Sequence, residues 1–297
     1  MENKDLINLL DGIQEDRDDT PKEKRIILID ALNLFFRNFA VIGTLNSNGA
    51  HVGGLGGFFR SLGALIRNIE ADQVYVVFDG IGGSDSRKNI IPEYKSGRRA
   101  TRITNWEAFD SVEDENDSQI DQIQRIAQYL KTLPVKTVQI DKVEADDVIA
   151  YMGEELSHDP NNKIFIVSSD KDYLQLAKEN LIIYRPIEKK YYTPETILET
   201  FGCSVDNFLL YKLLMGDSSD KIEGLKGLGP KKLYKYFPEL RGKGLGLEGL
   251  LKIAENKLTE HILYARLLSD PHGLKKKHKV MDLSKPMIDE NDIKYLD

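Results

Sequence analysis

Four short runs of β-branched and aliphatic residues, each ending in an acidic residue, constrain the fold of this chain most strongly. In chain order these runs are RIILID, QVYVVFD, VKTVQID and KIFIVSSD. Nearly continuous apolar runs of this kind are typical of parallel strands that are buried on both faces. Between them, segments 57–69, 120–133 and 145–156 carry apolar residues at helical spacing. The alternation predicts an α/β fold with a mostly parallel central sheet, flanked by helices and joined by short right-handed crossovers.

Composition divides the chain into three parts. Residues 1–24 are highly charged and have no apolar period, so we expect a mobile N-terminal extension. The α/β pattern occupies residues 25–190, and residues 191–297 are mostly helical with glycine-rich turns. Segment 80–118 is too long for an ordinary connection. It is consistent both with an arch or lid that orders around a substrate and with plain surface disorder.

Cysteine, histidine and hydropathy exclude several classes of site. The one cysteine cannot form an internal disulfide, and the five histidines are scattered without the spacing of zinc ligands. No apolar run approaches the roughly 18 residues that span a bilayer, and the acidic N-terminal segment is not typical of a signal peptide. We therefore expect a cytoplasmic protein without a membrane partner, in which any metal ion is bound by oxygen.

Positive charge is concentrated in two segments, although the net charge of the chain is −7. Segment 87–102 holds six basic residues against one acid, and segment 224–237 holds four lysines and no acid. Such clusters suit contact with the phosphates of a nucleic acid. A solvated face is the common alternative for any single basic run. Both interpretations stay open at this stage.

Nine acidic residues in five segments form the main candidate site. They are Asp30, Asp79, Glu144, Asp146, Asp147, Asp170, Asp172, Asp217 and Asp220. Four of the five segments end or follow predicted strands, and the carboxyl ends of parallel strands meet at one edge of a sheet. Each acid alone could cap a helix or form a turn. If the strand continues through Asp170 and Asp172, both side chains point the same way.

Carboxylates gathered so closely favour a bound cation. Two carboxylates about 4 Å apart repel by about 4 kcal/mol at an effective dielectric near 20. Without histidine or cysteine, such a set suits hard cations, above all Mg²⁺, which Mn²⁺ can replace. Two such ions about 3.5–4 Å apart can activate a water and stabilise the leaving oxygen of a phosphodiester. The acids therefore predict a site for two metal ions that needs no protein nucleophile.

Six motifs occur in order along the chain: IDALNLFFR, VFDG, IPEYKSGR, VEADDVIAY, SSDKDYLQL and MGDSSDKIEGLKGLGPKK. Together they resemble the flap endonuclease or 5′-3′ exonuclease family, and they look closest to its stand-alone bacteriophage members. The resemblance covers nearly everything from Arg25 onward and implies a 5′ nuclease (PIN-like) core at residues 25–190. It does not extend to the N-terminal extension or to the sequence of the insertion after Asp79. It implies that all nine acids form the metal site, some directly and some through water.

The same resemblance implies roles for aromatic, basic and glycine residues. Lys95 and Arg98 would contact the scissile phosphate, while Tyr94 would stack on a base unless it is a core aromatic. Further DNA contacts are expected from Arg37, Arg87, Lys88, Arg99, Gly224, Gly227, Gly229, Lys231 and Lys232. The glycines and the last two lysines belong to a helix-turn-helix DNA-binding element near residues 216–237. Family members also bind K⁺ there through backbone carbonyls.

These features together predict a Mg²⁺-dependent, structure-specific 5′ nuclease. By resemblance it would act on DNA with a 5′ flap or 5′ end and on RNA in RNA–DNA hybrids, as a monomer working with replication proteins in replication or repair. Two alternatives stay open: a ribonuclease that acts on structured RNA, and a DNA-junction binding protein that holds metal without turnover. Preference for exonuclease or endonuclease action depends on whether segment 80–118 closes into an arch.

Overall fold

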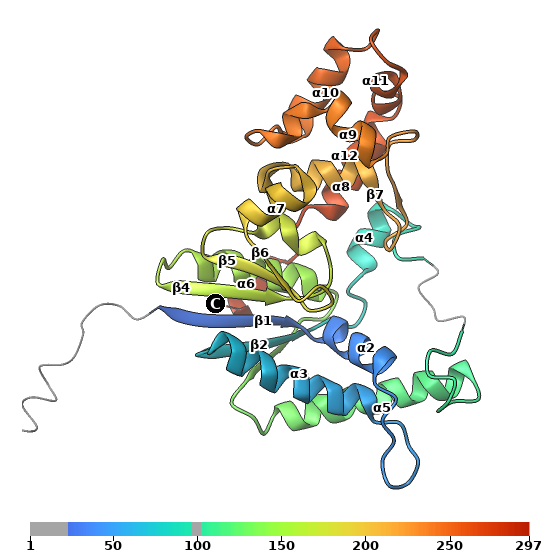
Figure 1. Ribbon diagram of the computed structural model, residues 1–297, viewed down its shortest axis with the longest axis vertical. Helices are drawn as coiled ribbons and strands as arrows, with labels where there is room; N and C mark the ends of the chain where they lie inside the picture. The colour runs from blue at the N-terminus through green and yellow to red at the C-terminus, as the bar shows by residue number, and fades with distance from the viewer. Residues whose placement is uncertain (1–22, 97–101, 297) are drawn as a thin grey trace, which may run out of the picture.

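A six-stranded sheet forms the centre of the protein, in a computed structural model that describes residues 23–96 and 102–296 (Figure 1). The strand order is β3-β2-β1-β4-β5-β6. The strands are β1 (Lys24–Asp30), β2 (Gln73–Phe78), β3 (Lys136–Gln139), β4 (Asn162–Val167), β5 (Leu181–Arg185) and β6 (Lys190–Tyr192). The first five are parallel, and β6 pairs with β5 in the antiparallel sense. The predicted mostly parallel sheet is confirmed.

Two strands were missed by the sequence patterns. The four predicted strands correspond to β1, β2, β3 and β4, whereas β5 and β6 match none of the four predicted runs. The predicted boundary between residues 190 and 191 consequently falls inside β6, which belongs to the sheet. The sheet therefore extends slightly further along the chain than the patterns indicate.

Helices cover both faces of the sheet, which explains why residues 26–29 of its central strand are all apolar. Helices α2 (Ala31–Val41), α3 (Gly53–Ile69) and α5 (Val112–Leu130) cover one face, and α6 (Ala145–Ser157) covers the other (Figure 1). Along β1, Ile27 and Ile29 are fully buried in the core beneath α2, α3 and α5, while Ile26 and Leu28 are fully buried in the core beneath α6. The strand ends at Asp30, which therefore lies at the carboxyl edge of the sheet.

The remainder of the chain is mainly helical, as expected. It contains α7 (Pro194–Phe201), α8 (Phe208–Met215), α9 (Pro230–Tyr236), α10 (Gly246–Asn256), α11 (Ile262–Leu267), α12 (Pro271–Met281) and α13 (Glu290–Leu296). Shorter elements are the 3₁₀ helices η1 (Asp172–Leu176), η2 (Val205–Asn207) and η3 (Pro238–Arg241), and a hairpin of β7 (Gly216–Asp217) and β8 (Ile222–Glu223). In Figure 1, helices α7 to α12 stack above β5 and β6, the last two strands of the sheet.

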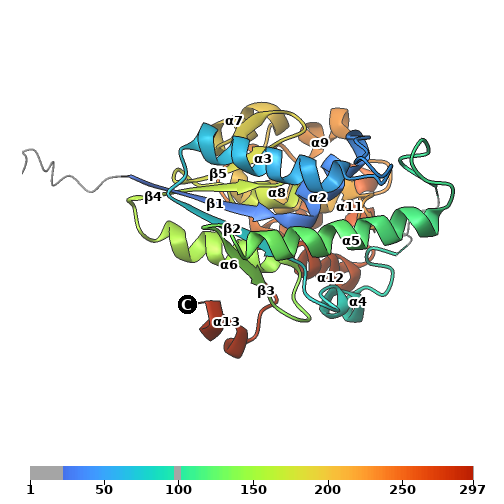
Figure 2. The same ribbon diagram turned by 90° about the horizontal axis from the view of Figure 1, so that it is seen from below.

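The last helix returns to the α/β core. In Figure 2, α13 lies beside β3 and α6, and Tyr295 and Leu296 share a cavity with Lys136 of β3 and Met152 of α6. In the described part of the chain, no helix combines the length and the apolar character that crossing a bilayer requires.

Segment 80–118 is partly helical. It contains α4 (Asp85–Ile90), a turn through Ser96, and the first residues of α5. Residues 97–101 of this segment, like residues 1–22 of the predicted extension, lie outside the described residues. Closure of the segment into an arch stays a prediction.

Candidate active site

Asp30 and Asp79 lie side by side at the carboxyl edge of the sheet. Asp30 caps α2, because its Oδ1 accepts a hydrogen bond of 3.0 Å from the Asn33 amide. Asp79 Oδ1 accepts one of 3.0 Å from the amide of Ala145, which ties the end of β2 to the first turn of α6. Burial, together with the negative charges of Asp79 and Asp170, raises the pKa of Asp30 to about 7. A divalent cation at this edge would favour the ionised form.

Glu144, Asp146 and Asp147 gather at the start of α6, with one oxygen of each within 4.8 Å of the others. Glu144 and Asp147 are buried, whereas Asp146 is more exposed and borders the cavity in front of the sheet edge. Asp146 Oδ1 is buried yet accepts no hydrogen bond, although Arg87 Nη1 lies 3.3 Å away. Among these three acids, Asp146 offers the oxygen that is most available to a metal ion.

A second carboxylate group is formed by Asp172, Asp217 and Asp220, again within 4.8 Å. The chain reaches it by a route that differs from the prediction. Strand β4 ends at Val167, and the backbone turns into η1, so Asp170 and Asp172 do not continue one strand. Instead, Asp170 Oδ1 accepts a hydrogen bond of 2.9 Å from the Asp172 amide. Asp172 therefore belongs to the second carboxylate group, whereas Asp170 lies outside it.

Lys212 provides the counter-charge of this second group. Its side chain is buried on α8 and forms ion pairs with Asp172 and, at 2.7 Å, with Asp217 Oδ2. Although burial alone would raise it, the pairing with Lys212 lowers the pKa of Asp217 to about 2, aided by hydrogen bonds from Ser219. Sequence reasoning missed Lys212. The available signal was a single lysine within the otherwise apolar helix FLLYKLLM.

Two adjoining cavities connect the carboxylate groups. The first, of about 560 Å³, is bordered by Asp30, Asp79, Lys95, Asp146 and Asp170, and by an apolar wall that includes Phe36 and Ile187. The second, of about 510 Å³, is bordered by Lys212 and Asp217. Asn33, Ser169 and Asp170 belong to both. All nine predicted acids border these cavities or belong to the two groups of close carboxylate oxygens, although Asp147 of the first group borders neither cavity.

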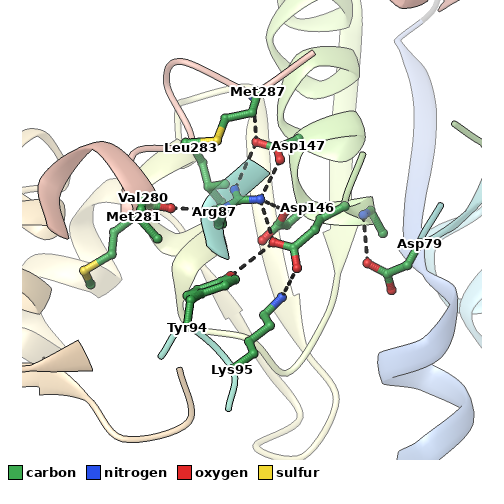
Figure 3. Close-up of polar contacts among 12 residues, drawn as sticks. Asp79, Arg87, Tyr94, Lys95, Asp146, Asp147, Val280, Met281, Leu283 and Met287 are labelled. Atoms are coloured by element: carbon green, nitrogen blue, oxygen red, sulfur yellow. Dashed lines mark hydrogen bonds and ion pairs between the residues drawn. The ribbon is translucent and has the colours of Figure 1, made fainter. Parts of the chain in front are cut away.

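Lys95 lies between the two carboxylate groups. Its Nζ is 2.5 Å from Glu144 Oε1, and its backbone amide donates a hydrogen bond of 3.2 Å to the Asp220 carbonyl (Figure 3). Burial alone would lower the pKa of Lys95, but Asp146 and Glu144 raise it. A charged ammonium group therefore borders the cavity, where a phosphate could exchange with Glu144.

Two residues predicted to face DNA are instead buried. Arg87 is 2 % exposed and forms ion pairs with Glu144, Asp146 and Asp147, so it is not part of an exposed basic surface. Tyr94 is also 2 % exposed, and its hydroxyl donates a hydrogen bond of 3.1 Å to Glu144 Oε2. Tyr94 is thus a core aromatic in this structure, and the expectation that it stacks on a base does not fit its position.

The other predicted DNA contacts are placed as follows. Arg37 borders the first cavity and is half-buried, and Lys88, Lys231 and Lys232 are exposed. Arg98 and Arg99 lie outside the described residues. Contact of these side chains with DNA stays a prediction.

The predicted helix-turn-helix element near residues 216–237 contains the β7–β8 hairpin, a loop at residues 224–229 and α9, while the helix before it, α8, ends at Met215. A Cβ on Gly224 would lie 2.4 Å from the backbone of Met215, and Gly227 has φ of 88°, so both positions require glycine. Gly229 is open, with no atom within 4 Å of a Cβ built there. The open backbone at Gly229 leaves room for a phosphate to approach α9.

Two carbonyls of the same loop accept hydrogen bonds from basic side chains. The carbonyl of Glu223 accepts a hydrogen bond of 2.7 Å from Lys277 Nζ, and that of Lys226 accepts one of 2.9 Å from Arg266 Nη1. Binding of K⁺ by backbone carbonyls of this element stays a prediction.

Comparison with known proteins finds similarity to 5′-3′ exonucleases and to a DNA polymerase I. A family model described as "5′-3′ exonuclease, N-terminal resolvase-like domain" matches residues 25–202. A 5′-3′ exonuclease of Aquifex aeolicus is 31% identical over 209 residues, which cover 70% of this chain and 67% of that protein. DNA polymerase I of Bacillus subtilis is 28% identical over 246 residues, but these cover 81% of this chain and only 26% of the polymerase.

Solved structures show a similar fold. The flap endonuclease of bacteriophage T5, in a pseudo-enzyme-product complex with DNA and metal ions, superposes with a TM-score of 0.71 and 20% identity, covering 88% of this chain and 90% of that chain. The T5 5′-exonuclease with bound zinc gives a TM-score of 0.70 at 21% identity, with the same coverage. The catalytic core of Rad2 in complex with a DNA substrate gives 0.53 at 18% identity, covering 93% and 85%.

Proposed function

Because the chain belongs to the 5′-3′ exonuclease family of phosphodiester hydrolases, we propose that it is a Mg²⁺-dependent, structure-specific 5′ nuclease that hydrolyses DNA by a two-metal-ion mechanism. The observation that carries the mechanism is the pair of carboxylate groups around two adjoining cavities, with Lys95 between them. The T5 relative was solved with DNA and metal ions at a comparable fold, which supports the same ligands here.

The donor set fits hard divalent cations. The described candidate ligands are carboxylates, two of which have a buried oxygen that accepts no hydrogen bond, Asp146 Oδ1 and Asp172 Oδ1. We assign one metal site to the acids that border the first cavity, Asp30, Asp79, Asp146 and Asp170, with Glu144 beside them, and a second metal site to Asp172, Asp217 and Asp220. Bound Mg²⁺ would supply Lewis-acid activation of a water and stabilisation of the leaving oxygen, and Mn²⁺ would substitute.

The chain's own side chains would position the substrate and stabilise its charge. Lys95 Nζ would leave Glu144 and bind the scissile phosphate, where it offsets the negative charge that develops during hydrolysis. Arg37 at the cavity would bind a neighbouring phosphate, and Arg98 is proposed for the same role as Lys95. Lys231 and Lys232 are exposed on α9, where they would hold the phosphates of the duplex.

The proposed substrates are DNA duplexes with a 5′ flap or 5′ end, and RNA in RNA–DNA hybrids. Hydrolysis near the junction of duplex and single strand would remove displaced flaps or primers in replication or repair. The wall of the first cavity provides apolar contact for an unpaired base, through Phe36, Val41 and Ile187, each of which is at least 44 % exposed.

The proposal is tested with pure protein and a 5′-labelled flap duplex. We expect release of short labelled products in Mg²⁺ and none in EDTA, and no release by the Asp146→Asn variant. A hairpin RNA without a hybrid region serves as the comparison substrate. Preferential cleavage of that RNA would favour a structured-RNA ribonuclease, and tight flap binding without product would favour a junction-binding protein.

A further inference from the structure

Arg87 is a buried charged side chain beside the first carboxylate group, and all three of its side-chain nitrogens donate hydrogen bonds. These hydrogen bonds all reach segments far away in the sequence (Figure 3). Nε donates to the Val280 carbonyl at 2.9 Å, Nη1 donates to Glu144 Oε2 and Asp147 Oδ2 at 2.6 Å each, and Nη2 donates to Asp147 Oδ1 at 3.0 Å. One guanidinium thus joins α4, α6 and the end of α12.

Asp147 has both oxygens engaged within the protein. Besides the two-pronged contact with Arg87, its Oδ1 accepts a hydrogen bond of 2.9 Å from the Met287 amide. The residue is 1 % exposed and does not border the first cavity, whereas its neighbour Asp146 does. Adjacent residues of a helix point about 100° apart, so the two acids face different surroundings. Figure 3 shows Asp147 turned toward Arg87 and Met287.

The segment that supplies Val280 and Met287 also contacts η1, the element that begins at Asp172 of the second carboxylate group. Gln175 of η1 donates to the Met281 carbonyl at 3.0 Å and accepts from the Leu283 amide at 3.0 Å. Residues 280–287 are therefore hydrogen-bonded to α6 through Asp147 and to η1 through Gln175.

We propose that Asp147 is the partner of Arg87 rather than a metal ligand, and that Arg87 is a positioning residue for cleavage. Through Asp147 and Val280, Arg87 fixes α4, which precedes Lys95, against α6 and the 280–287 connection. Its contact with Glu144 holds that carboxylate beside Lys95 Nζ. This inference rests on the proposed function for the identity of the metal and the substrate.

Two double variants with the same net charge provide the test. Arg87→Met/Asp147→Asn and Arg87→Met/Asp146→Asn each remove one positive and one negative charge next to the same helix. Mn²⁺ binding is measured by calorimetry on the protein without DNA. We expect the first variant to bind Mn²⁺ within about threefold of the parent protein, and the second to bind it about 10- to 100-fold more weakly. Equal weakening in both variants would overturn the assignment of Asp147.

Cleavage by the first double variant tests the positioning role. At saturating Mg²⁺ and DNA, we expect its single-turnover rate to fall about 10- to 100-fold although its Mn²⁺ affinity is retained. The single variant Arg87→Lys should cleave nearly as slowly as this double variant, because one ammonium group cannot reach Val280 and both oxygens of Asp147. Arg67→Met, at an exposed arginine of α3, is the control and should cleave like the parent protein. An unchanged rate in Arg87→Met/Asp147→Asn would contradict the role.

Thermal stability in EDTA tests the pair independently of metal and activity. Arg87→Met and Asp147→Asn should each lower the Tm, and the double variant should melt no lower than the worse single variant, because each single change leaves the partner's charge buried. A double variant that melts at the sum of the two decreases, or that does not fold, would show that the residues act separately. If the parent protein failed to cut flap DNA, the proposed function would fail, while this coupling would still decide the role of Asp147.

Discussion

The buried lysine of the second carboxylate group gives the most quantitative prediction. Lys212 is 5 % exposed and forms ion pairs with Asp172 and Asp217, which are themselves largely buried. Lys212→Met keeps a similar apolar length but removes the ammonium group. Two carboxylates would then lie buried beside Asp220 without their counter-charge.

The size of the effect follows from the burial. Removing one partner of a buried ion pair costs about 3–5 kcal/mol of stability. An unfolding entropy of about 2.1 cal/mol/K per residue over 297 residues is about 0.6 kcal/mol/K, so the expected decrease in Tm is about 5–8 °C. Mg²⁺ should recover more of the Tm in the variant than in the parent protein, because a divalent ion can replace the lost ammonium group.

The assay is thermal denaturation in EDTA and in Mg²⁺, with Lys178→Met as the matched control. Lys178 pairs with Glu154 on the surface, where both side chains are at least 40% exposed, so its loss should lower the Tm by less than about 2 °C. If Lys212→Met melted like Lys178→Met in EDTA, the assignment of Lys212 as the counter-charge of this group would be refuted.

Three further predictions concern Lys95, Asp30 and Asp147, which lie at or near the first cavity and the first carboxylate group. Lys95→Ala should lower the single-turnover rate by about 10²- to 10³-fold while DNA affinity, measured in Ca²⁺, changes less than about tenfold; an equal loss of affinity would mean that Lys95 only anchors a phosphate. Asp30→Asn should abolish cleavage yet raise the Tm of the metal-free protein, because one buried repulsive charge is removed; a lower Tm would contradict the repulsion. Burial raises the pKa of Asp30 to about 7, and burial with Asp146 raises that of Asp147 to about 6. The native state therefore retains protons that the unfolded chain has released, so stability in EDTA should fall as the pH rises from about 4 to about 7, and Mg²⁺ should reduce this fall; a constant Tm across that range would argue against the raised pKa values.

Much of the fold was predictable because the sheet is buried on both faces. The middle of β1, residues 26–29, is apolar at every position, and the acids that follow β1, β2 and β4 mark the edge where the site forms. Strand β5 was missed because its apolar run is only three residues long, 181–183, and β6 because it has three residues in all; both lie among polar residues that resemble a loop. Their position is decided by pairing with β4, which local patterns do not report.

The site was predictable in its acids but not in its internal partners. Strand ends place Asp30 and Asp79 together, next to Asp146 in the first turn of α6. No sequence pattern indicates which cation each acid faces. Arg87 contacts Val280, which lies 193 residues away, and its place in a basic run suggested an exposed surface instead. Burial of a long charged side chain depends on carboxylates that only the tertiary fold brings near it. Lys212 was missed for the same reason.

The central claim is that the carboxylate groups bind divalent ions that hydrolyse DNA beside Lys95. The most direct measurement follows a 5′-labelled flap duplex in single-turnover reactions over a Mg²⁺ titration, with the parent protein and Asp146→Asn. The structure predicts Mg²⁺-dependent product from the parent protein, none in EDTA, and none from Asp146→Asn at Mg²⁺ concentrations that saturate the parent protein. Product formation in EDTA, or an unimpaired Asp146→Asn variant, would contradict the assignment of this site.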